Sequence, residues 1–82
     1  MPQEELPQHL LDITTETCPM TFVRTRLALD RLPRGGILLV RLRGEEPARN
    51  VPRTATEQGH EVLDQRAAED GSVLLTIRKG GG

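Results

Sequence analysis

The sequence predicts an α/β two-layer sandwich of order βαβαββ, in which two helices cover one face of a mixed four-stranded sheet. Short apolar runs with strand-like alternation flank two helical patterns, and a turn signal separates the last two runs. Two strand–helix–strand units favour parallel pairing with right-handed crossovers, whereas the final hairpin favours antiparallel pairing. The other face of the sheet is then open to solvent or to a partner.

The first strand and helix fall within the first forty residues. A short, partly β-branched run predicts a strand over Leu10–Thr14, with Leu11 and Ile13 on one face. Met20–Leu32 predicts an amphipathic helix that ends before the turn Pro33–Gly36. Its apolar stripe comprises Phe22, Thr25, Ala28, Leu29 and Leu32, widened by Val23 and Leu27.

The clearest strand is Ile37–Arg43, whose start is apolar on both faces and therefore favours a central position in the sheet. Gly44–Pro47 is interpreted as a turn. A second helix is expected over Val51–Gln58, with Asn50 as its N-cap and Pro52 in its first turn. This helix has few large apolar side chains and is expected to pack through Val51 and Ala55.

The last two strands are expected over His60–Arg66 and Val73–Lys79, with the turn signal Glu69-Asp70-Gly71 between them. The final strand places its apolar residues on one face, namely Val73, Leu75 and Ile77. We therefore expect a single domain over residues 10–79, a flexible N-terminal tail over 1–9 and a flexible glycine tail over 80–82.

The charge balance argues against general nucleic-acid binding. The 82-residue chain has 11 basic and 12 acidic residues, a net charge of −1, so we expect no direct DNA contact. Arginines are nevertheless concentrated in the middle of the chain, including Arg24, Arg26 and Arg49. They form either a mixed solvated surface or a basic face that docks a protein or an anionic RNA.

Cysteine usage and apolar runs indicate the compartment. Cys18 is the only cysteine, so an internal disulfide is impossible. The sequence shows neither a signal peptide nor an apolar run long enough to span a membrane. We therefore expect a reduced, cytoplasmic monomer that does not contact membranes.

Cys18 is the one candidate for chemistry. It directly precedes Pro19, which suits the first turn of a helix, so the thiol is expected at a helix N-terminus. There the N–H groups of Met20 and Thr21 and the helix dipole would favour the thiolate, which is the nucleophilic form. The alternative is a buried cysteine that acts as a small apolar residue.

The two histidines give weaker signals. His60 is expected to be a surface or half-buried residue, with a proton donor as the functional alternative, and His9 falls in the expected tail. One cysteine and two distant histidines lack the spacing of metal ligands, so we expect no metal and no cofactor.

Several segments resemble the TusA/SirA-type sulfur-carrier family over nearly the whole chain after residue 9. The matching segments are Leu11-Asp12, Cys18-Pro19, Glu46-Pro47, Asn50-Val51-Pro52, Gly59-His60-Glu61 and Ile77-Arg78-Lys79-Gly80. The resemblance implies a small cytoplasmic protein that carries sulfur as a persulfide on Cys18. It also implies a cysteine desulfurase or rhodanese-like protein as donor. The implied acceptors belong to tRNA thiolation, molybdenum-cofactor enzymes or sulfur oxidation.

The sequence departs from the family pattern near the thiol. The family motif is Cys-Pro-x-Pro, but Thr21 stands in place of the second proline, giving CPMT, and Thr15 replaces the usual glycine. Thr21 restores a backbone N–H and adds a hydroxyl near the sulfur. The predicted site therefore comprises Cys18 and the supporting residues Pro19, Met20 and Thr21. If active, the protein is a sulfurtransferase-type carrier. The alternative is a non-catalytic regulatory or protein-binding module whose thiol senses redox state.

Overall fold

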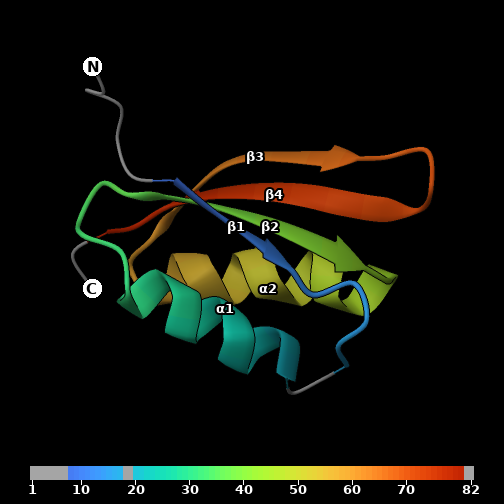
Figure 1. Cartoon of the computed structure of the whole chain (residues 1–82), viewed down its shortest axis with the longest axis horizontal. Coiled ribbons are helices and arrows are strands. Elements are labelled where there is room, and N and C mark those ends of the chain that lie inside the picture. Colours follow the sequence, from blue (N-terminus) through green and yellow to red (C-terminus); the bar gives the residue numbers. More distant parts are fainter. Residues whose placement is uncertain (1–7, 18–19, 81–82) are drawn as a thin grey trace.

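A computed structural model describes residues 8–17 and 20–80, which form a four-stranded sheet with both helices on one face (Figure 1). The elements in chain order are β1 (Gln8–Asp12), α1 (Met20–Asp30), β2 (Ile37–Arg43), α2 (Glu45–Glu57), β3 (Glu61–Ala67) and β4 (Ser72–Arg78). This confirms the predicted α/β two-layer sandwich and its βαβαββ order.

The sheet has the strand order β1-β2-β4-β3. Strand β1 pairs in parallel with β2, and β4 pairs antiparallel with both β2 and β3. Strand β2 is therefore central, as predicted, but β4 separates it from β3. The expected parallel pairing is correct for β1 and β2, whereas β2 and β3 run in the same direction without touching.

Side-chain burial explains this strand order. Strand β4 contributes Leu75 and Ile77 to the core, next to the buried Leu38 and Val40 of β2. Strand β3 is exposed along almost its whole length and carries a bulge between Val62 and Asp64. An apolar strand gains more from a central position, and a polar, bulged strand suits the edge of a sheet.

The core lies between the sheet and the helices. Its apolar members are Ile13, Ala28, Leu29, Leu38, Val40, Leu42, Val51, Ala55, Leu75 and Ile77. Helix α1 also buries Thr21 and Thr25, whose hydroxyl donates to the Thr21 carbonyl oxygen at 2.7 Å. Because this face is turned to the sheet, Val23 and Leu27 point away from it and are 41% and 53% exposed. The prediction that they widen the buried stripe is wrong.

Helix α2 begins at Glu45, six residues earlier than predicted, and it still buries Val51 and Ala55 as expected. The segment Gly44–Pro47, which the sequence predicts as a loop turn, instead forms the N-cap and first helical turn of α2. Glu45 and Glu46 suit the positive end of the helix dipole, and the missing N–H of Pro47 has no helical partner to lose at this position. Asn50 is therefore no N-cap: it lies inside the helix and accepts from Arg53 Nη2 at 3.3 Å.

The other boundaries differ slightly from the prediction. Strand β1 starts at Gln8, so residues 8 and 9 pair with β2 and do not belong to the expected tail of residues 1–9. Residues 1–7 and 81–82 lie outside the described residues. Within the described ranges, neither helix is long and apolar enough to cross a membrane.

Candidate functional site

The predicted thiol belongs to the connection between β1 and α1. Cys18 and Pro19 themselves lie outside the described residues, while Thr17 and Met20 on either side are described. The connection leaves the carboxyl end of β1 at the edge where β2 also ends (Figure 1). Loops at the carboxyl ends of parallel strands are frequent positions for functional groups.

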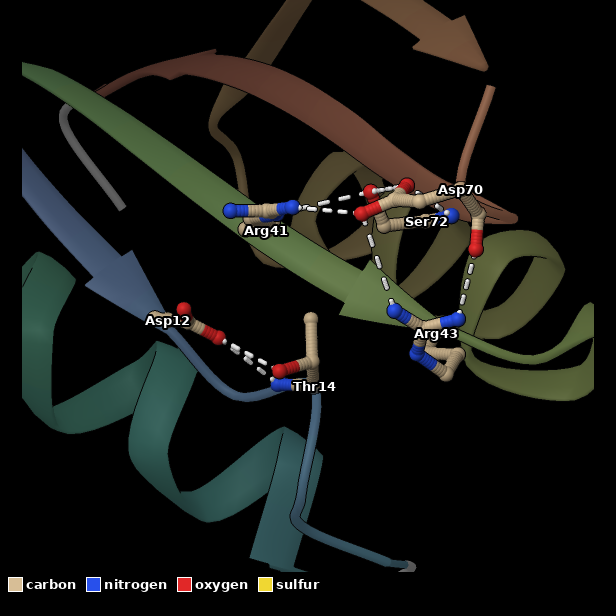
Figure 2. Close-up of polar contacts among 6 residues, drawn as sticks. All are labelled: Asp12, Thr14, Arg41, Arg43, Asp70 and Ser72. Atoms are coloured by element: carbon tan, nitrogen blue, oxygen red, sulfur yellow. Dashed lines mark hydrogen bonds and ion pairs between the residues drawn. The ribbon is translucent and has the colours of Figure 1, made fainter. Parts of the chain in front are cut away.

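The segment before Cys18 is tied to the sheet by a short polar turn. Asp12 Oδ1 accepts from both the N–H and the hydroxyl of Thr14, at 3.0 and 2.8 Å (Figure 2). The N–H of buried Ile13 donates to the Arg41 carbonyl oxygen at 2.9 Å, and the Glu16 N–H donates to the Ile13 carbonyl oxygen at 3.1 Å. These contacts fix the path of the chain toward the thiol.

The amides that the sequence assigns to the sulfur have another partner in the structure. The N–H groups of Met20 and Thr21 donate to the Thr17 carbonyl oxygen at 2.7 and 3.3 Å. An anion can therefore use these donors only in competition with Thr17. The Thr21 side chain is only 1% exposed, which places it in the interior beside the sheet, whereas Met20 is exposed.

A second polar cluster lies on the open face of the sheet near this loop (Figure 2). Asp70 Oδ1 accepts from the hydroxyl and the N–H of Ser72 at 2.6 and 2.9 Å, and its Oδ2 accepts from Arg41 Nη2 at 2.7 Å. Arg43 Nη1 donates to the Asp70 carbonyl oxygen at 2.7 Å. These contacts join the β3–β4 turn to the end of β2.

The carboxylates and the arginine side chains of this cluster carry opposite charges that offset one another. Hydrogen bonds from Ser72, followed by Arg41, hold the pKa of Asp70 well below its usual range. Hydrogen bonds from Thr14, with a smaller contribution from the two arginines, lower the pKa of Asp12. Arg41 and Arg43 thus lie beside two carboxylates that offset their positive charge.

Helix α1 carries two of the candidates for the basic face, Arg24 and Arg26, and α2 carries the third, Arg49. Arg24 lies 3.7 Å from Glu16 of the loop, an ion pair that joins the helix to the segment before the thiol. Arg26 lines a groove of about 160 Å³ between α1 and α2, together with Phe22 and Val51. The groove is mostly apolar, so it suits a side chain of a protein partner better than an extended polyanion.

His60 lies away from the thiol segment. It is 9% exposed and shares a hollow with Asp30, the last residue of α1, whereas Cys18 precedes the first residue of that helix. The 11-residue helix separates the two ends by roughly 16 Å. His60 therefore lies near the opposite end of α1 from Met20, the described residue that follows the thiol segment. Within the described ranges, no group of three or more His, Cys, Asp or Glu side chains could hold a metal ion.

Comparison with known proteins assigns the family. The model of the family described as sulfurtransferase TusA matches residues 9–79. The chain belongs to the sulfurtransferase TusA family. A candidate sulfur carrier protein of Archaeoglobus fulgidus is 39% identical over 70 residues, which cover 85% of this chain and 80% of that protein. The sulfur carrier protein TusA of Pseudomonas putida is 33% identical over 89% of this chain and 90% of its own length.

A solved structure agrees on the TusA-family fold. The SirA-like protein of Desulfitobacterium hafniense has a TM-score of 0.78 and 23% identity, covering 89% of this chain and 99% of that chain. The sequence-based resemblance to the TusA/SirA-like family is therefore confirmed.

Sequence reasoning missed the Asp12–Thr14 turn, although Asp followed two residues later by Thr is a known pattern for such side-chain-to-backbone bonds.

Proposed function

We propose that this protein is a sulfur carrier that holds sulfane sulfur as a persulfide on Cys18. The observation that carries the proposal is the single cysteine of a chain whose relatives are named as sulfur carriers. A persulfide requires a thiol, and the chain offers no second one. The cargo therefore has one possible attachment point if this protein shares the role of its relatives.

The transfer step conserves atoms and electrons. The Cys18 thiolate attacks the outer sulfur of a persulfide on the donor protein, and the donor's S–S bond breaks as the new S–S bond forms. The donor leaves as a thiolate and Cys18 becomes a persulfide, without an external oxidant or reductant. Since the chain has no second cysteine to displace the sulfur, a thiolate or another nucleophile of the acceptor must take it.

The surroundings of the thiol segment support an anionic sulfur. Helix α1 starts two residues after Cys18, so the positive end of its dipole lies at this segment. The bond from Ile13 to Arg41 and the turn at Asp12 hold the preceding residues on the sheet. Because these preceding residues are already held, less ordering is needed when a donor docks.

The exposed face of α1 supports protein partners. Met20, Val23 and Leu27 recur at helical spacing and are all exposed, with Arg24 on the same helix and Arg31 just past its end close to Leu27. Such a face suits a partner surface that combines an apolar patch with carboxylates. We propose a cysteine desulfurase or a rhodanese-like protein as donor and a tRNA-thiolation, molybdenum-cofactor or sulfur-oxidation protein as acceptor. These partners would place the carrier in the reducing cytoplasm.

The test is the intact mass of the protein after incubation with a cysteine desulfurase and cysteine. We expect a gain of one sulfur atom that a reductant removes and that Cys18→Ser abolishes. His9→Gln is the matched control, since it changes an exposed residue of β1, and it should load as the wild type does. No gain with desulfurase or rhodanese-type donors would overturn the proposal and favour the protein-binding module.

A further inference from the structure

The last described residue, Gly80, fits tightly against the turn between α2 and β3. Its N–H donates to His60 Nδ1 at 3.0 Å. A Cβ atom at this position would lie 1.9 Å from the Gly59 carbonyl oxygen, so only glycine allows the approach. The His60 N–H in turn donates to the Ala55 carbonyl oxygen at 3.0 Å, which holds the histidine on the end of α2.

Lys79 anchors the same end of the chain in two further ways. Its backbone exchanges hydrogen bonds with Gly35 and Gly36 at 2.9 and 2.8 Å. Its ammonium donates to the carbonyl oxygens of Leu29 and Leu32 at 2.7 and 3.2 Å, at the end of α1. The chain after β4 is thus held by α1, by the turn before β2 and by His60.

The contact between His60 and Gly80 exists for only one protonation state of the ring. A backbone N–H can only donate, so Nδ1 must carry a lone pair, and the neutral ring then bears its proton on Nε2. When the ring takes up a second proton, Nδ1 becomes a donor and faces the Gly80 N–H. Two donors cannot bond, so the contact is lost.

The groups around the ring favour the neutral state. Burial is the main cause that lowers the pKa of His60, and the nearby Lys79 ammonium lowers it further. Asp30 of α1 opposes both effects, and Arg26 of the same helix lines the hollow as well. Gln58, at the end of α2, lines it without a charge. On β3 itself, Glu61 pairs with Arg78.

We propose that His60 is a pH-sensitive latch, which holds the backbone at Gly80 while the ring is neutral and releases Gly80 on protonation. The proposal does not depend on sulfur chemistry. The unfolded chain binds a proton on this histidine more readily than the folded chain. The latch therefore contributes its full stability above pH about 6.5, and this contribution is lost as the pH falls toward the folded-state pKa.

Nuclear magnetic resonance on the full chain tests the latch through two readouts. The ¹⁵N shifts of the His60 ring should identify the Nε2–H tautomer at neutral pH. The protection of the Gly80 amide against hydrogen exchange should fall, by at most about tenfold per pH unit, as the pH decreases from about 6.5 toward the folded-state pKa, and should level off below it. An Nδ1–H tautomer, or Gly80 protection that stays constant through the His60 titration, would overturn the proposal.

The matched variant is His60→Asn, whose side-chain oxygen can accept from Gly80 but does not titrate. We expect the Gly80 amide of this variant to stay protected across the same pH range, whereas His9→Asn keeps the pH dependence of the wild type. A pH-dependent loss of protection in His60→Asn would assign the effect to another group. Should His60→Asn not fold, the tautomer and the wild-type titration still decide the question.

Discussion

The Gln65 side-chain amide donates to the Ala48 carbonyl oxygen at 2.9 Å, and Ala48 is the residue four positions before Pro52. In a regular helix that oxygen would accept from the N–H of residue 52, which proline lacks. Gln65 of the edge strand β3 therefore supplies the bond that Pro52 withholds from α2. This contact explains how a helix with an internal proline remains continuous across the sheet.

Gln65→Ala should lower the free energy of unfolding by about 0.5–1.5 kcal/mol, because it leaves a half-buried carbonyl without its protein partner. Urea denaturation of a double-mutant cycle with Pro52→Ala measures the coupling. Alanine restores the N–H at position 52, so Gln65→Ala should cost clearly less in the Pro52→Ala background. Equal costs in both backgrounds would show that Gln65 acts independently of the proline.

Asp70 should make the fold sensitive to acid. Its pKa is lowered in the folded chain, so its contribution to stability is present above its unfolded value of about 3.9 and is lost as the pH falls below that value. We expect the melting temperature of the wild type to fall more steeply below pH about 4 than that of Asp70→Asn. The carboxyl is about half exposed, so solvent screening keeps the effect modest.

Asp64→Asn is the control for this experiment, since Asp64 forms an exposed ion pair with Arg66 of the same strand, β3. It should keep the acid sensitivity of the wild type. Parallel acid profiles of wild type and Asp70→Asn would contradict the role assigned to the Asp70 cluster.

Lys79→Met should cost about 1 kcal/mol, because two carbonyl oxygens at the end of α1 lose a charged donor. Arg78→Met, one residue earlier, removes only an exposed ion pair with Glu61 and should cost at most about 0.5 kcal/mol. Urea denaturation compares the free energies of unfolding of the two variants.

Lys79→Met should also raise the pKa of His60, since it removes a neighbouring positive charge. An unchanged or lower pKa of His60 would contradict this electrostatic cause.

Thr21→Pro, which creates the family's Cys-Pro-x-Pro motif, should be tolerated. Position 21 is the second residue of α1, where the variant loses the 3.3 Å bond from its N–H to the Thr17 carbonyl oxygen. We expect a change within about 1 kcal/mol and unchanged sulfur loading. Thr25→Pro, one turn later, should cost about 3 kcal/mol because proline there disrupts the helix interior. Similar losses in both variants would show that Thr21 is needed for the fold itself.

The sequence predicted the elements with strong local signals. The apolar run Ile37–Arg43 was predicted as a strand with the bounds observed, and the helix after Pro19 begins at Met20 as expected. The start of α2 was misplaced, because Gly44-Glu45-Glu46-Pro47 is compatible with both a turn and a first helical turn. Pro52 also suits the first turn of a helix, so the predicted start lies near it, and in the structure the distant Gln65 supplies the bond that Pro52 withholds.

The candidate site was predicted from one residue type in one position. Cys18 before a proline at the start of a helix is a local pattern, so no tertiary information was needed to nominate it. The buried position of Thr21 and the competing acceptor Thr17 could not be read from the pattern, because they depend on how α1 rotates on the sheet. The same rotation exposes Val23 and Leu27.

By itself, the sequence determined the order of the elements, part of the core and the single thiol, because periodicity, turn residues and residue identity are local properties. Only the tertiary structure decided that β4 lies between β2 and β3, that Asp70 binds Arg41, and that His60 holds Gly80 far from the thiol segment. The Arg41–Asp70 and His60–Gly80 contacts join residues 29 and 20 positions apart. The burial and hydrogen-bonding energy that selects them arises only when the whole chain packs.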